Sequence, residues 1–274
     1  MTSERSFAAV AALLFAASAI VTITWSESMA GMGGMAMPGG WTMSMAWMRM
    51  PGQSWPGAAA TFLGMWIVMM VAMMLPSLVP MLARYRQAVA KAGATRFGSL
   101  TLTVGVGYFL VWALIGVATF PLGVLLAEIQ MLWPALARGA PIAVGAVVLV
   151  AGALQLTAWK ARQLACCRQV PGARGRGLPT DLGTALGHGL RLGLHCSHCC
   201  AGLTAILLVI GMMDLRAMAG VTAAITLERL APASEAAARV IGIVIIVAGL
   251  LLITRAVAGA APHGASLPGL FAAS

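Results

Sequence analysis

Hydrophobic residues along the chain form long runs that are separated by short polar connections. A helix needs about 20 apolar residues to cross a bilayer. Apolar runs near this length occupy residues 7–25, 58–82, 100–126, 141–159, 194–213, and 240–253 with its flanks. Residues 217–230 form a shorter and weaker candidate. We therefore predict an all-α fold, a polytopic transmembrane helix bundle with six or seven spans, and we favour seven.

The first two apolar runs carry features that bear on whether the first is cleaved and on where the second helix ends. The first could belong to a signal peptide, but it is long for one, and the cleavage pattern around Trp25-Ser26-Glu27 is weak. We expect it to be retained. In the second run, Pro76 and Pro80 lack the backbone N–H that an α-helix uses, so we expect them to kink or end the helix.

Three regions follow from this pattern. Residues 1–57 hold the first span and a loop rich in Gly, Met and Trp, which we expect to be disordered. Residues 58–258 form the transmembrane helix bundle, which carries a cluster of Cys and His residues. Residues 259–274 form a flexible C-terminal tail.

Composition supports the membrane class. Of the 274 residues, 61% are hydrophobic and only 9% are charged, whereas soluble domains carry roughly 25% charged residues. Seventeen basic and seven acidic residues give a net charge of +10. The basic residues lie in short loops between spans, where they set topology and meet anionic lipid head groups. We therefore expect membrane lipids, not nucleic acid, as the partner of this charge.

The basic loops predict the orientation of the chain. Four basic residues lie between the second and third runs, and six lie between the fourth and fifth: Arg84, Arg86, Lys91 and Arg96, then Lys160, Arg162, Arg168, Arg174, Arg176 and Arg191. Under the positive-inside rule both loops are cytoplasmic. We predict a multi-pass protein of the bacterial inner membrane, with a cytoplasmic N-terminus and a periplasmic Met-rich loop.

A dense group of Cys and His residues lies at the start of the fifth run: His188, His195, Cys196, His198, Cys199 and Cys200. On a helix, His188, His195 and Cys199 share one stripe, with Cys196 and Cys200 as a second i,i+4 pair beside it. Imidazole and thiolate ligands suit Cu(I) or Zn(II). A cysteine can also act as a small buried hydrophobe, but this explains single cysteines better than a cluster.

Cys166 and Cys167 form a second thiol pair, flanked by Arg162 and Arg168. Adjacent cysteines rarely form a disulfide with each other, and basic neighbours favour the thiolate. They could complete the metal site of the fifth run, act as an entry ligand, or be inert.

Fourteen of the 19 methionines lie between Met29 and Met81. Eight are in the periplasmic loop: Met29, Met32, Met35, Met37, Met43, Met45, Met48 and Met50. Thioethers bind Cu(I) without losing a proton, so this loop could capture copper. In the second run Met65, Met69 and Met73 follow each other at i,i+4, with Met74 one step round the helix. These could line a copper path, although methionine is also an adaptable core filler.

Few other polar residues interrupt the spans. Tyr108 and Trp112 share a helix face, and Gln155 could form a helix–helix hydrogen bond. We expect Glu228-Arg229 to form an ion pair at the membrane interface. The motifs G-x-x-x-x-G-K-[ST] and H-E-x-x-H are absent from the sequence, so this chain alone is not an ATP-driven pump.

Several short patterns together suggest a family: Trp66-x-x-Met69, Ala72-Met73-Met74-x-Pro76, Gly107-Tyr108 with Trp112, Lys160 with Cys167-Arg168, His188-Gly189, Cys196-x-x-Cys199-Cys200, Gly211-x-Met213 and Leu227-Glu228-Arg229. With them the chain resembles the bacterial family of predicted metal-binding integral membrane proteins of unknown function. The resemblance runs from about Met65 to Pro232, and its most specific part is Cys-x-x-Cys-Cys. It implies metal binding and supplies no reaction.

The chain also departs from the family pattern. Gln163 stands where a first cysteine is frequent, Cys166-Cys167 is doubled, and His198 replaces a common glycine. These changes leave the ligand set open.

Our leading hypothesis is a protein that binds or transports a soft transition metal. Its ligand chemistry favours Cu(I), with zinc as the second candidate. Periplasmic methionines outside and thiols inside favour uptake or delivery. A metallochaperone or a membrane complex could be a partner. The alternatives are a membrane thiol oxidoreductase, with Cys196/Cys199 and Cys166/Cys167 as exchanging pairs, and an accessory or assembly subunit of a larger complex.

Overall fold

The computed structural model describes residues 2–31, 33–93, 95–167 and 181–260. Its helices and strands are α1 (Thr2–Gly31), β1 (Met35–Met37), β2 (Trp41–Met43), the 3-10 helix η1 (Met45–Trp47), α2 (Trp55–Lys91), α3 (Phe97–Leu132), α4 (Pro134–Gln155), α5 (Ala158–Cys167), α6 (Leu182–Ile210), α7 (Leu215–Leu230) and α8 (Ser234–Ala260). The predicted all-α class is therefore confirmed, with one small hairpin added.

Six of the described helices are long and apolar enough to cross a membrane: α1, α2, α3, α4, α6 and α8. The expected six or seven spans agree with this number. The favoured seventh, residues 217–230, corresponds to α7, which has only 16 residues and is shorter than a full crossing requires. The protein is thus a multi-pass membrane protein.

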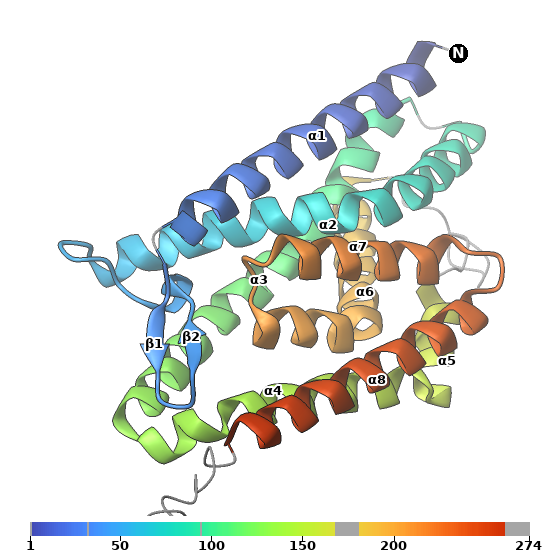
Figure 1. Ribbon diagram of the computed structural model, residues 1–274. Helices are drawn as coiled ribbons and strands as arrows, with labels where there is room; N and C mark the ends of the chain where they lie inside the picture. The colour runs from blue at the N-terminus through green and yellow to red at the C-terminus, as the bar shows by residue number, and fades with distance from the viewer. Residues whose placement is uncertain (1, 32, 94, 168–180, 261–274) are drawn as a thin grey trace, which may run out of the picture.

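The helices pack as pairs around a central group. In Figure 1, α1 runs along α2 at one side of the molecule and α8 runs along α4 at the other, with α6 and α7 between them. We compared the most apolar 18-residue stretch of each helix. The buried share of this stretch is 61% in α2 and 44% in α6, but only 11% in α1 and 17% in α8. Of these four helices, α2 and α6 are therefore the most enclosed: α2 packs against α1, α3 and α7, and α6 packs against α3, α4, α5 and α7.

Pro76 and Pro80 do not end α2, which continues through both residues to Lys91. Ser54 caps the start of the helix, where its hydroxyl oxygen accepts a hydrogen bond from the Gly57 N–H at 3.2 Å. The buried face of α2 therefore extends unbroken from Phe62 to Val89.

Helix α6 begins 12 residues earlier than the sequence predicts, at Leu182 instead of residue 194. Asp181 caps it by accepting a hydrogen bond from the Thr184 N–H. The glycines in the stretch before the cysteines let α6 approach α3 closely. A Cβ on Gly189 would lie 2.3 Å from the Val104 carbonyl oxygen, and one on Gly193 would lie 2.8 Å from the Tyr108 carbonyl oxygen. The cysteines consequently lie in the middle of a helix and not in its first turns, which corrects our expectation.

The Met-rich segment after α1 is partly ordered, contrary to the disordered loop that we expected. Strands β1 and β2 pair in antiparallel fashion, and Met35 lies opposite Met43. Met37 and Met43 are buried in a small cluster with Ala127 and Ala137. The Trp41 Nε1–H donates a hydrogen bond of 2.8 Å to the Ala137 carbonyl oxygen. The hairpin is thus attached to the α3–α4 end of the bundle, and two of its methionines serve as core.

We predict that Gly189→Ala destabilises the protein, because the new Cβ meets the backbone of α3 and the two helices must separate. Overpacking of this kind costs about 1–3 kcal/mol, although alanine is the better helix former by about 1 kcal/mol. Gly187→Ala is the matched control, because a Cβ there has nothing within 4 Å. Thermal unfolding in detergent measures both, and equal midpoints for the two variants would contradict the close contact.

Candidate metal centre

Three buried thiols occupy successive turns of α6. Cys196, Cys199 and Cys200 have exposed fractions of 0%, 2% and 1%. Cys196 and Cys200 are one helical turn apart, and their Sγ atoms are separated by 3.9 Å. The i,i+4 pairing that helical periodicity predicts for these two residues therefore brings their sulfurs into contact.

A guanidinium group from α7 lies against this sulfur pair. Arg229 Nη1 is 3.3 Å from Cys196 Sγ and donates to Ser77 Oγ at 2.9 Å, and Nη2 contacts Met81 Sδ at 3.0 Å. The Tyr108 hydroxyl completes the group, at 2.8 Å from Cys196 Sγ and 3.5 Å from Arg229 Nη1. Side chains from α3, α6 and α7 thus meet at Cys196 Sγ. Helix α2 joins the group through Ser77 and Met81, which contact Arg229.

The residue before Arg229 organises a second polar cluster. Glu228 Oε2 forms an ion pair with Lys160 Nζ at 2.6 Å, and Glu228 Oε1 accepts a hydrogen bond from Gln155 Nε2 at 2.7 Å. Lys160 Nζ also donates to the Cys199 carbonyl oxygen at 2.7 Å. The ion pair therefore connects α4, α5 and α7 to the cysteine turn of α6.

The interfacial ion pair that we expected from Glu228-Arg229 is wrong in its location. Glu228 is only 1% exposed and Arg229 5%, and the two side chains reach toward different helices. Their partners had to be buried as well, because an uncompensated charge inside an apolar bundle is strongly unfavourable.

The histidines lie apart from the buried thiols. His195 and His198 are exposed on α6, and half-buried His188 stacks on Tyr85 of α2, with ring centroids 5.5 Å apart. Among the described residues, no three His, Cys, Asp or Glu side chains are arranged to hold a metal ion together. The predicted stripe of His188, His195 and Cys199 is therefore divided: Cys199 lies in the core, whereas His195 lies on the outer surface.

The other sequence-predicted ligands are distributed over two helices. Met69, Met73 and Met74 are buried in α2, with exposed fractions of 1%, 3% and 0%. Cys166 and Cys167 end α5, but their side chains fall outside the described residues. Their participation in the α6 site stays a prediction.

Sequence reasoning did not place Ser77, Met81, Lys160 and Arg229 around the thiols, although Lys160 and Arg229 belong to the family pattern. The available signal was chemical type, since ionisable residues within or beside membrane spans usually face the bundle interior and serve a function. The sequence could not show that residues far apart in the chain meet at the same turn of α6.

Fold and site together define a polytopic membrane protein with a buried, sulfur-rich centre. The model of the family described as copper chaperone (PpoB2) matches residues 63–252. The chain belongs to this family, and its function is copper-related. The matched region runs from α2 to α8 and contains the whole thiol centre. No curated protein and no solved structure matches the chain.

We predict that Glu228→Gln and Lys160→Met each destabilise the protein by about 3–5 kcal/mol, because each leaves one buried charge unpaired. The double variant should recover much of this loss, since it removes both charges. Glu235→Gln is the control, because the Glu235–Arg239 pair is 61% and 71% exposed and such pairs contribute at most about 1 kcal/mol.

Thermal unfolding of the single and double variants in detergent measures the interaction energy between Lys160 and Glu228. Single variants no less stable than Glu235→Gln would show that the buried pair does not hold the helices together.

Proposed function

We propose that the protein binds Cu(I) at the thiols of α6 and carries it through the membrane-embedded bundle for delivery on the other side. The observation that carries this proposal is the pair of buried sulfurs, Cys196 and Cys200, 3.9 Å apart at the centre of a chain whose family is described as copper chaperone. Copper is the cargo in this proposal and not a resident cofactor.

The sulfur separation supports a shared ion. Metal–thiolate bonds measure about 2.3 Å, so two thiolates that bind one ion lie at most about 4.6 Å apart. The distance of 3.9 Å between Cys196 and Cys200 is within this limit. Soft sulfur ligands select Cu(I), whereas structural zinc takes four ligands in a tetrahedron. The described residues offer no such group of His, Cys, Asp and Glu, so copper is favoured over zinc.

Charge balance also supports copper at this place. One Cu(I) ion with two thiolates carries a net charge of −1, which is costly to bury without a counter-charge. The guanidinium of Arg229 lies 3.3 Å from Cys196 Sγ and supplies that charge. In this proposal Arg229 stabilises the loaded centre electrostatically without being a ligand.

A path of sulfur atoms along α2 supports movement of the ion. Met65, Met69 and Met73 follow one another at intervals of four residues, and Met81 reaches the Arg229 cluster. Each interval advances about 6 Å along the helix. Met73 and Met74 are buried in the core that also contains the thiols, so these methionines would pass copper toward Cys196 and Cys200.

The direction of transport rests on the predicted topology. With a cytoplasmic N-terminus in a bacterial inner membrane, the hairpin end is periplasmic and the ion would move inward. Met37 and Met43 are occupied as hairpin core, so capture would rely on other methionines of residues 1–57, such as exposed Met35. Cys166-Cys167 at the end of α5 would transfer copper to a soluble metallochaperone. His195 and His198, exposed in the middle of α6, would meet only a membrane partner.

Burial favours copper binding over thiol exchange. A thiol that exchanges disulfides with a partner must be accessible, yet Cys196 and Cys199 are 0% and 2% exposed. Their position in the middle of α6 also removes the helix N-terminus that would have activated a thiol oxidoreductase.

We predict that purified protein, loaded anaerobically in detergent, binds Cu(I) most tightly at the thiol centre. Cys196→Ser/Cys200→Ser should weaken this tightest site at least about a hundredfold, because both thiolates are lost. Competition with a chromophoric Cu(I) chelator measures the affinity.

Ser197→Ala is the matched control for the thiol variants. Its hydroxyl donates to the Leu194 carbonyl oxygen within α6 and does not face the thiols, so wild-type affinity is expected. An unchanged affinity in the double thiol variant, with folding confirmed by thermal unfolding, would refute the proposed centre.

A further inference from the structure

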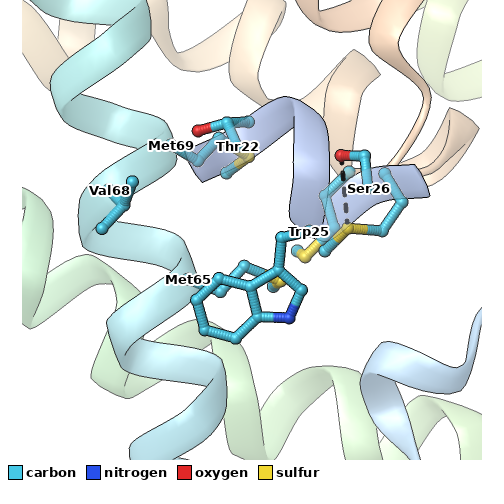
Figure 2. Close-up of a pocket in the computed structure, with 8 residues that line it drawn as sticks. Thr22, Trp25, Ser26, Met65, Val68 and Met69 are labelled. Atoms are coloured by element: carbon cyan, nitrogen blue, oxygen red, sulfur yellow. Dashed lines mark hydrogen bonds between the residues drawn. The ribbon is translucent and has the colours of Figure 1, made fainter. Parts of the chain in front are cut away.

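A small cavity lies between α1, α2 and the connection from α6 to α7. Its lining comes from three segments: Thr22, Trp25 and Ser26; Met65, Val68 and Met69; and Met212 and Met213. Figure 2 shows side chains of α1 and α2 gathered around it. Its free volume is about 10 Å³, close to that of one water-sized sphere. The cavity therefore has room for a single small occupant.

Half of the lining residues are methionines, and the backbone places them there from two directions. Met65 and Met69 are one turn apart on the buried face of α2. Met212 and Met213 follow Gly211, which ends α6 with a φ of +131°, a conformation that favours glycine. Met69 and Met212 are each only 1% exposed. Two separate segments thus bring four thioethers to one buried cavity.

The side chains that line the cavity offer few kinds of metal ligand. It contains no carboxylate, imidazole or thiol, so the cavity offers no negative charge to a divalent ion. The Ser26 hydroxyl contacts Met213 Sδ at 3.8 Å, as the dashed line in Figure 2 marks. Neutral thioethers select soft monovalent ions, and the aromatic ring of Trp25 can stabilise a cation.

We propose that this cavity is a second Cu(I) site, formed by the thioethers of Met65, Met69, Met212 and Met213 and shielded by Trp25. This inference rests on the proposed function, since it gives the copper a first binding place within the bundle. Methionine has three rotatable bonds, so the four side chains can close around an ion in a cavity of this size. Core packing alone explains single methionines. It does not explain why four thioethers surround one cavity from which charged groups are absent.

The position of the cavity suits a site that precedes the thiols. Met69 lies eight residues before Ser77, which contacts Arg229 at the thiol centre, so the two places are separated by about 12 Å along α2. Under the predicted topology the α6–α7 connection is on the periplasmic side. Copper would therefore meet neutral thioethers first and thiolates second, which orders the two sites by increasing affinity.

The test uses full-length protein in detergent with all five cysteines replaced by serine. Cu(I) is supplied anaerobically in competition with a chromophoric chelator. We expect the tightest site of this protein to hold one Cu(I) per chain, with the same affinity at pH 5 and pH 7, because thioethers have no proton to lose. Binding by imidazoles would instead weaken at pH 5.

Leucine substitutions locate the ion in this cysteine-free protein. Met65→Leu/Met69→Leu and Met212→Leu/Met213→Leu each conserve apolar volume and should weaken binding at least about tenfold. Val68→Ala changes the same cavity without removing sulfur, and Met131→Leu removes an exposed thioether of α3. Both controls should bind like the cysteine-free parent.

The proposal is overturned if the cysteine-free protein binds no Cu(I), or if both leucine pairs bind as tightly as the two controls. Either result leaves the thiol centre untouched, because that centre is judged in protein with its cysteines intact. Conversely, loss of the thiol centre in Cys196→Ser/Cys200→Ser would not remove the methionine site.

Discussion

Two adjacent charged residues at the end of α7 impose the constraint on which the centre of this protein depends. Glu228 and Arg229 are buried, and a buried charge must be met by partners from other helices. Glu228 fixes Lys160 of α5 and Gln155 of α4, while Arg229 reaches α2, α3 and α6. The short helix α7 therefore connects the longer helices through its two charged side chains. These contacts determine which faces of the longer helices surround the thiols.

The same network gives the cysteine turn its chemical character. Lys160 donates to the Cys199 carbonyl oxygen, and Arg229 lies beside Cys196 Sγ. Close approach of α3 and α6 at Gly189 and Gly193 then brings the Tyr108 hydroxyl to the same sulfur. Positive charge and buried sulfur meet at one place, and this combination supports the proposed binding of a monovalent soft ion by thiolates. The glycines and the buried charges act together, because the network could not form if α6 stood farther from α3.

Long apolar runs allowed most of this fold to be predicted from the sequence. The start of α6 was missed because its first turns are rich in glycine, which is a weak helix former, and because the packing of these glycines on α3 is not visible in the sequence. The hairpin was missed because Met37 and Met43 acquire a core only when Ala127 and Ala137 are brought near. In the site, periodicity predicted the Cys196–Cys200 pair, and residue type marked the methionines of α2. The rotation of α6 that leaves His195 and His198 exposed, and the meeting of Arg229 with Cys196, depend on tertiary packing that spacing along the chain does not encode.

The central claim is that the buried thiols, and not the exposed imidazoles, hold the first equivalent of copper. X-ray absorption at the copper edge, on wild-type protein loaded with one equivalent of Cu(I), tests it most directly. The account predicts a coordination shell of sulfur alone, which is retained in His195→Ala/His198→Ala and altered in Cys196→Ser/Cys200→Ser. A shell containing nitrogen that disappears in the histidine variant, with no change in the cysteine variant, would contradict it.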